Sequence, residues 1–310
     1  RNTKKIKLID DQKPVDWIEK TEWLIKNSKN IKVLKNTTVT TYNYNNHLIA
    51  FEDRSVGSPQ DDTKPELVLH KIRTKHTILA NGHIERFLSF RNNDLPGVML
   101  AASFEKYIHR YGVVPDESPV IFTNNSSAFS LVDSLLTLGH KPKAYIDVRD
   151  QKKIEKETLE LLTKYSIPFY AKSEIEGCDG NKEVQKVSVR VKKDKIIKIK
   201  TSMLCVSGGF NPDIHLFTQS KGLIKWDESL LTFRPDKPFQ NTITLGSVSG
   251  NFSYQKTINE INKKLGFLEE VNDLELKLDI NGPEKFEIKE LWETNHAKKS
   301  LWSKSFIDLQ

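Results

Sequence analysis

The chain of 310 residues is 37% hydrophobic and 29% charged, which is typical of a globular protein long enough to form two domains. It has no apolar run close to the about 20 residues that cross a bilayer, and no secretory signal at its start. Its net charge of +7 comes from lysines spread along the chain without a recognition motif, so we expect no binding to nucleic acid. We therefore predict a cytoplasmic protein that does not bind membranes.

The first 80 residues predict a helix followed by a group of strands. Pro14 suits the first turn of a helix, and apolar residues follow it at helical spacing. A surface loop is expected over residues 54–65. Around it, β-branched and alternating residues predict strands at 31–34, 37–42, 47–51, 66–73 and 77–80. We expect the last of these to be a buried strand.

The pair Asn81-Gly82 ends that apolar run, and both residue types tolerate positive φ. In an open α/β sheet, ligands bind beyond the carboxyl ends of the strands, so this turn is a candidate ligand contact. The ionisable residues His83, Glu85 and Arg86 follow it. Arg86 could hold a phosphate or a carboxylate, or form an ordinary surface pair with Glu85, and the pattern leaves both open.

Residues 98–111 predict a helix that ends at Gly112. Strands and helices then alternate, with strand 119–122, helix 126–138, strand 144–148, a helix over about 152–165 and strand 167–170. Such alternation predicts a parallel sheet.

The turn after strand 119–122 decides whether this unit can hold a dinucleotide. A Rossmann turn uses G-x-G-x-x-G/A so that the backbone can approach the pyrophosphate. Here Asn124 and Asn125 precede Ser126, Ser127 and Ala128, while Asp147 stands where a ribose-binding acid is found. We predict a Rossmann-like fold that has lost its nucleotide site, with Ser126 or Ser127 as the helix N-cap.

The remainder of the chain returns to strands before a last helix. Residues 172–200 predict a β segment, and the apolar strand 204–206 leads to Gly208-Gly209. His215 is interpreted as a packed histidine. Residues 242–250 contain a strand that ends near Gly246-Ser247, a helix follows over 257–265, and 267–290 is interpreted as a linker.

No motif in the sequence supplies catalysis or metal binding. There is no nucleophile elbow, P-loop or H-E-x-x-H, and Cys178 and Cys205 are far apart without C-x-x-C spacing. We therefore predict no catalytic residue, no metal site and no disulfide in this chain.

Five segments resemble the alpha subunits of heterotetrameric sarcosine oxidases. The family stretches "ATGAxERP…PGVMLA" and "SGGWNPxxHLFSQSxG" match residues 80–101 and 207–222. The "TNN" turn, an "AGAANG"-like turn at Gly246-Ser247 and the "PLWxVP…KAFVDFQND" stretch are also similar. The segments are similar, too, to the matching subunits of opine oxidases and bacterial cyanide synthases.

This resemblance implies an α/β, two-dinucleotide-binding-domain fold of the FAD/NAD-linked reductase type, with an incomplete first domain. Residues 1–115 are then the C-terminal half of the first domain, completed by 201–266. Residues 116–200 form an inserted Rossmann-like domain with a degenerate nucleotide turn, and 267–310 are a linker and the start of a small third domain. Because Arg1 is not a Met and the end shows no closing signal, we expect an internal piece of a longer polypeptide, with the GxGxxG half before Arg1.

The resemblance also implies a cofactor and partners. The family places NAD in this region, and the matching cofactor-binding positions are Val39, Ala80, Asn81, Gly82, Gly246 and Ser247. We add Arg86 to these candidates because its planar side chain could hold a phosphate. It places FAD and FMN on, or shared with, partner subunits of beta, gamma and delta type, and tetrahydrofolate on a downstream domain. The expected substrate is sarcosine, oxidatively demethylated to glycine, and we expect this piece alone to be inactive.

Two alternatives remain open. One is the alpha-type subunit of an opine oxidase or other amino-acid oxidase, whose cysteine-rich iron–sulfur module after the dinucleotide domain has no match here. The other is a non-catalytic scaffold whose nucleotide sites are both degenerate.

Overall fold

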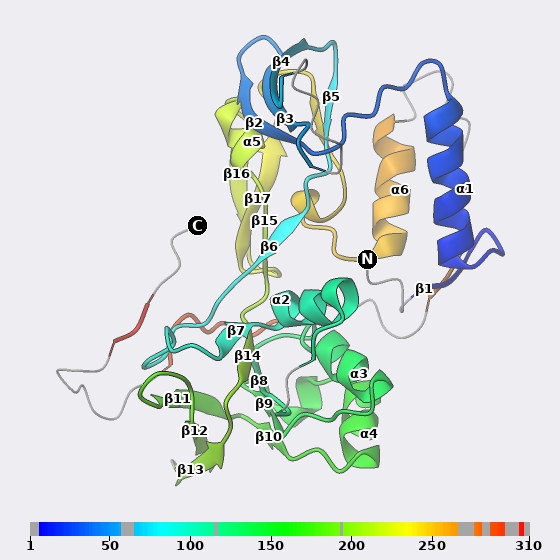
Figure 1. The fold of residues 1–310 in the computed structure, drawn as a ribbon. Coiled ribbons are helices and arrows are strands. Elements are labelled where there is room, and N and C mark those ends of the chain that lie inside the picture. The colour runs from blue at the N-terminus through cyan, green and yellow to red at the C-terminus, as the bar shows by residue number, and fades with distance from the viewer. Residues whose placement is uncertain are drawn as a thin grey trace.

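The computed structural model describes residues 6–56, 65–114, 117–192, 195–265, 276–280, 286–294 and 304–306. The described chain forms two lobes, one above the other in Figure 1. The upper lobe holds β2 to β5, α1, α5, α6 and β16 to β18, and the lower lobe holds β7 to β14 and α2 to α4. Two strands that run between the lobes, β6 (His83–Glu85) and β15 (Phe210–Pro212), pair with each other in antiparallel fashion.

A parallel sheet forms the centre of the lower lobe. Its strands follow the order β10-β9-β8-β14-β7 and are Phe169–Ala171, Ala144–Asp147, Val120–Thr123, Leu204–Ser207 and Val98–Leu100. The three central strands are buried at every position, as expected for a parallel sheet covered on both faces. The parallel sheet predicted from the alternating pattern is therefore confirmed.

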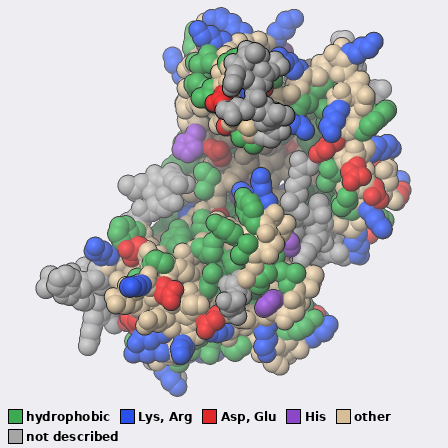
Figure 2. Space-filling view, in the orientation of Figure 1, with side chains coloured by type: hydrophobic (Ala, Val, Ile, Leu, Met, Phe, Trp, Pro, Cys, Tyr) green, Lys and Arg blue, Asp and Glu red, His purple; other side chains and the backbone are tan. Residues whose placement is uncertain are grey.

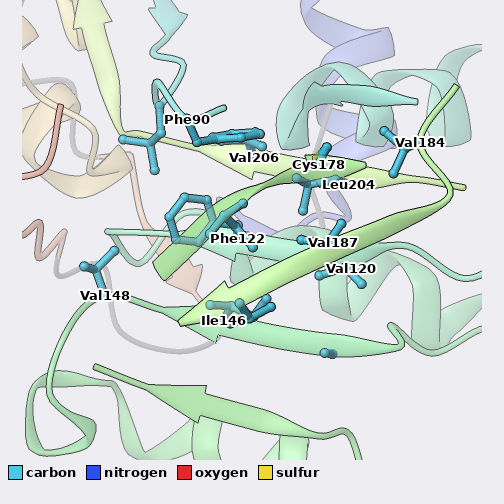
Figure 3. Packing of buried hydrophobic residues seen from close by; sticks show 14 residues of the cluster. Phe90, Val120, Phe122, Ile146, Val148, Cys178, Val184, Val187, Leu204 and Val206 are labelled. Atoms are coloured by element: carbon cyan, nitrogen blue, oxygen red, sulfur yellow. The ribbon is translucent and has the colours of Figure 1, made fainter. Parts of the chain in front are cut away.

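Alternate residues of the central strands enter two separate cores, because successive side chains of a strand point to opposite faces. Ile121, Tyr145 and Cys205 face the helices, where they pack with residues of α2, α3 and α4. Phe122, Ile146 and Val206 face the other side, where Figure 3 shows them against Val187 and Cys178. The second core is closed by an antiparallel sheet of β11 (Glu174–Asp179), β12 (Lys186–Val191) and β13 (Lys195–Lys200), which confirms the predicted β segment.

The helices of the lower lobe begin and end at slightly different residues from those predicted. They are α2 (Ala101–Lys106) with its π-helical extension η1 (Tyr107–Tyr111), α3 (Phe129–Thr137), the 3₁₀-helix η2 (Gln151–Lys153) and α4 (Lys156–Lys164). The predicted helix 98–111 was wrong in its first three residues, which form β7 beside β14. Gly112 ends η1 with φ of 66°.

The predicted N-cap of α3 was also wrong. Ala128 occupies the N-cap position, and neither Ser126 nor Ser127 caps the helix. Instead the Asn125 Oδ1 accepts a hydrogen bond from the backbone N–H of Ser127 at 2.8 Å. The hydroxyls of both serines bind elsewhere, to Glu155 and Ser207 among others.

The upper lobe is built from small sheets and peripheral helices. β2, β3 and β4 form an antiparallel meander, as predicted, and β5 pairs in parallel with β18. The register of that parallel pair joins Thr77 to Thr242 and Leu79 to Thr244. The elements of this part are β1 (Ile6–Ile9), α1 (Pro14–Asn27), β2 (Thr37–Asn43), β3 (His47–Asp53), β4 (Leu67–Arg73), β5 (Thr77–Leu79), α5 (His215–Gln219), β16 (Leu223–Asp227), β17 (Thr232–Lys237), β18 (Thr242–Thr244), the 3₁₀-helix η4 (Gly246–Ser249), α6 (Tyr254–Leu265) and β19 (Leu278–Ile280).

Two strand predictions for the upper lobe were wrong. Residues 31–34 form no strand; Ile31 and Val33 are both 51% exposed, and no described strand pairs with this segment. β5 is not fully buried, because Ile78 is 47% exposed on the side away from Leu79.

Two further interpretations were wrong. The predicted linker 267–290 contains β19, which pairs with β1, although residues 266–275 and 281–285 lie outside the described residues. His215, interpreted as a packed histidine, is exposed at the first position of α5.

The parallel sheet extends beyond the predicted domain 116–200, because β7 and β14 lie outside that range. We therefore propose that the lower lobe begins near Leu88, whose buried side chain joins its core, and ends at Ser207. Within the described ranges, no helix is long and apolar enough to cross a membrane. The same ranges hold no group of three His, Cys, Asp or Glu side chains placed to bind a metal.

Candidate functional site

The carboxyl ends of β5 and β18 bring two of the predicted contact segments together. The backbone N–H of Leu245 donates to the Leu79 carbonyl at 2.9 Å, one residue beyond the last pair of the ladder. Ala80-Asn81-Gly82 and Gly246-Ser247 therefore leave the sheet at the same edge. In Figure 1 the golden turn beside α6 is η4, and Figure 2 shows the surface hollowed between the upper lobe and α2.

The first of these segments is open to solvent. Ala80 and Asn81 are exposed, and Gly82 has φ of 96° with no atom within 4 Å of the place where a Cβ would stand. The Asn81 Nδ2 donates to the Asp213 carbonyl at 2.7 Å, which fixes the turn. A ligand can thus approach the backbone here without meeting a side chain at Gly82.

The second segment, Gly246-Ser247, already forms a hydrogen bond with the carboxylate of Glu260. The Gly246 N–H donates to Glu260 Oε2 at 3.0 Å, and the Asn251 Nδ2 donates to the same oxygen at 2.7 Å. The Lys264 Nζ lies 2.6 Å from Glu260 Oε1. Burial acts to raise the pKa of Glu260, but these three donors outweigh it and lower the pKa. The Gly246 N–H is therefore already occupied by Glu260 and is not free to bind an anionic ligand.

Val39 packs against the apolar cluster that contains Leu79, the last residue of β5. It lies half-buried on β2, where the pairing with β3 shifts register between Val39 and Thr41. Its side chain packs with the cluster of Tyr42, Leu79 and Phe217. A polar cavity of about 650 Å³, lined by residues of β16 to β18, η4 and α6, lies beside the same elements.

His83, Glu85 and Arg86 do not form the ionisable cluster that their spacing indicates. The ring of His83 lies 4.3 Å from that of Phe210 and 5.4 Å from that of Phe252, measured between centroids. The side chain remains partly exposed, yet the neighbouring groups remove enough water to lower the pKa of His83. Glu85 and Arg86 contact different groups and do not pair with each other. The interpretation of these two residues as a surface ion pair was therefore wrong.

Glu85 is buried at the N-terminus of α2. Its Oε2 accepts a hydrogen bond from the Ala102 N–H at 2.7 Å, and Ser207 also binds the carboxyl group. Burial raises the pKa of Glu85 to about 7, and the nearby Glu105 acts in the same direction. Glu85 therefore changes charge near neutral pH, which its sequence position did not reveal.

Arg86 is held by main-chain carbonyls. Its Nε donates to Gly208 O at 2.8 Å and its Nη1 to Leu231 O at 2.6 Å, while its Cζ lies 4.6 Å from the ring centre of Trp292. Burial lowers the pKa of Arg86 to about 10. The guanidinium lines a cavity that does not include the Ala80-Asn81-Gly82 segment.

The turn of the lower lobe is filled by its own side chains. Asn124 and Asn125 are 1% and 0% exposed, so both amides lie inside the turn. The Asn125 Nδ2 donates to Asn124 Oδ1 and to Ser207 O, at 3.0 and 3.1 Å. The space that glycines leave for a pyrophosphate is occupied here by two amide groups.

A segment from the C-terminal part of the chain covers the same turn, and we call residues 286–289 the strap. The Ser126 N–H donates to Glu287 O at 3.1 Å, and the Lys289 N–H donates to Asn124 O at 2.9 Å. The Asn124 Nδ2 also donates to Lys289 O at 2.8 Å. The strap thus occupies the Ser126 N–H, a backbone donor before α3 that a phosphate would need. No local sequence signal indicated it.

Asp147 is likewise committed to a partner. It is fully buried, and Arg149 contacts its two oxygens at 2.8 to 3.3 Å. Burial opposes the charge on Arg149, but the Asp147 carboxylate raises the pKa of Arg149 overall. Asp147 therefore has no free oxygen facing solvent for a ribose.

No family model matches the chain. It is 29% identical over 254 residues to the sarcosine oxidase subunit alpha of Corynebacterium sp. (strain P-1), which covers 79% of this chain and 26% of that protein. It is 29% identical over 227 residues to the subunit alpha of Rhizobium meliloti (strain 1021), covering 73% and 22%. The chain thus spans about a quarter of the length of these relatives.

Solved structures resemble the fold at low sequence identity. L-proline dehydrogenase from P. horikoshii superposes with a TM-score of 0.52 at 19% identity, over 84% of this chain and 45% of that one. The bacillithiol disulfide reductase Bdr from Bacillus cereus gives 0.52 at 12% identity, over 77% and 71%. These likenesses confirm the predicted two-dinucleotide-binding-domain fold. The sequence matches, by themselves, make the chain similar to the alpha subunits of sarcosine oxidase.

Proposed function

We propose that this chain is the NAD-binding part of the alpha subunit of a flavin-dependent sarcosine oxidase. The observation that carries the proposal is the similarity to sarcosine oxidase alpha subunits over more than 70% of the chain. The shared edge of β5 and β18 supports it, because ligands of open α/β sheets bind beyond the carboxyl ends of parallel strands.

In this proposal the open segment Ala80-Asn81-Gly82 would hold the cofactor. NAD would supply hydride-transfer chemistry, and the residues of this chain would position it. Gly246 and Ser247 border the site from β18, but the Gly246 N–H already donates to Glu260 and so is not available to a phosphate. Val39 packs against the apolar cluster that contains Leu79 of β5, and the proposed site does not use Arg86.

The remaining parts of the reaction belong to other regions and chains. In this proposal FAD and FMN are held on, or shared with, partner subunits, and tetrahydrofolate binds a downstream domain. Sarcosine is oxidatively demethylated to glycine in that assembly, and this part of the chain alone is inactive.

A non-catalytic scaffold is the second candidate. It is favoured by the strap across the Asn124-Asn125 turn and by Glu260 at Gly246, since both fill positions that nucleotides use. Nucleotide content separates the two functions. We expect about one NAD per alpha-type polypeptide, released by denaturing the purified protein and measured by enzymatic cycling. A nucleotide-free protein that binds no added NAD would overturn the first proposal and support the scaffold.

A further inference from the structure

A small cavity of about 290 Å³ lies where β6, the β16–β17 hairpin and the segment that carries Trp292 meet. Its walls include three partly exposed aromatic rings: Trp226 is 39%, Phe233 49% and Trp292 45% exposed. The Trp226 ring lies 5.2 Å from Phe233 and 6.4 Å from Trp292, measured between centroids. The cavity is large enough for one aromatic ring with a small substituent.

The backbone fixes the position of Trp292 in this wall. The Ser89 N–H donates to Trp292 O at 3.0 Å, and the Thr294 N–H donates to Ser89 O at 2.9 Å. These bonds form a parallel bridge between Ser89 and Glu293. The aromatic wall is therefore built into the fold.

Arg86 brings a positive charge to the cavity that no described carboxylate neutralises. Its Nε and Nη1 bind carbonyls, which leaves Nη2 without an acceptor among the described residues. No Asp or Glu of the described ranges lines the cavity. A guanidinium held away from water gains most from an anion that accepts its remaining N–H groups.

Asn211 provides a second donor. Its Oδ1 accepts a hydrogen bond from the Thr232 hydroxyl at 3.0 Å, and its Nδ2 has no acceptor among the described residues. Asn211 and Arg86 both line the cavity. We propose that this cavity binds a small monocarboxylate with an aromatic or aliphatic group, its carboxylate held by Arg86 and Asn211 and its apolar part against Trp226 and Trp292. The proposal is independent of NAD binding.

Tryptophan fluorescence tests the proposal, because two of the five tryptophans line the cavity. The purified protein is titrated with benzoate and with benzamide, which share a shape and differ in charge. We expect a saturable change with benzoate, binding of benzamide weaker by about tenfold or more, and a smaller benzoate-induced change in a Trp226→Phe variant.

Asn211→Asp is the sharpest variant, because it keeps the acceptor for Thr232 and places a negative charge in the cavity. Asn259→Asp, on the exposed face of α6, is the matched control for net charge. We expect N211D to weaken benzoate binding by about tenfold or more and N259D to leave it unchanged. Arg86→Lys, which retains the charge but not the planar fork, is expected to weaken binding too.

Three results would overturn the proposal. They are equal binding of benzoate and benzamide, equal effects of N211D and N259D, and no saturable response to any monocarboxylate at up to about 10 mM, a concentration well above a Kd of about 1 mM. Binding of an acidic peptide without binding of free monocarboxylates would also replace the small-molecule site by a protein docking site.

Discussion

Glu85 and Arg86 are adjacent in the sequence, yet their side chains pack against different parts of the fold. The carboxyl group of Glu85 is enclosed at the start of α2, whereas the guanidinium of Arg86 lies against Trp292. Consecutive residues of an extended segment point to opposite sides, which explains the separation. The sequence places the two residues side by side but does not show which distant segments their side chains contact.

The raised pKa of Glu85 predicts a specific pH dependence of stability. The carboxyl group loses its proton near pH 4.5 in the unfolded chain and near pH 7 in the folded one, so the free energy of unfolding falls as the pH rises between these values. A Glu85→Gln variant removes this loss. We expect it to be about as stable as the parent at pH 5 and more stable by up to about 3 kcal/mol at pH 8.5, in thermal or urea unfolding. Parallel pH profiles of the two proteins would contradict this.

The buried pair of Asp147 and Arg149 predicts a large effect of removing one partner. Arg149→Met leaves the Asp147 carboxylate buried without its counter-charge, which costs about 3–5 kcal/mol. The double variant Asp147→Leu/Arg149→Met is expected to recover most of that loss. Urea unfolding measures the free energy of unfolding of each variant. A double variant no more stable than R149M would show that the unpaired Asp147 charge is not the cause of the loss.

At the scale of elements, alternating strands and helices were predicted well because their signal is local. The strands of the parallel sheet and the meander follow runs of apolar or β-branched residues. Residues 31–34 have the same composition, but no described strand pairs with this segment, so composition alone misled. The strap was not predictable, because Ser126 and Glu287 are 161 positions apart and no motif links them.

The strap predicts local protection of the Asn124-Asn125 turn. Lys289→Pro removes the N–H that donates to Asn124 O, and proline also restricts the residue before it. We expect hydrogen exchange at Ser126 to become faster by about tenfold or more, with exchange in β18 unchanged as an internal control. Unchanged exchange at Ser126 would show that the strap does not protect the turn.

At the scale of the whole molecule, both lobes contain parallel strands, but they differ in whether the sheet edge where a nucleotide would bind is filled or open. The lower-lobe turn is filled by Asn124, Asn125 and the strap, whereas the upper-lobe edge at Gly82 is open. The missing glycines of the lower turn were visible in the sequence, but Glu260 at Gly246 was not. Its only sequence signal was the i,i+4 spacing of Glu260 and Lys264 on a helix.

The central claim is that NAD binds at the edge of β5 and β18 and not at the lower-lobe turn. Its most direct test is NAD affinity of the complete alpha-type polypeptide, measured by calorimetry, with substitutions at each edge. Ala80→Trp places a bulky side chain on the exposed edge, and Asn124→Ala alters the filled turn. We predict that A80W loses most NAD binding while N124A keeps the parent affinity. NAD binding that survives A80W and is lost in N124A would contradict the account.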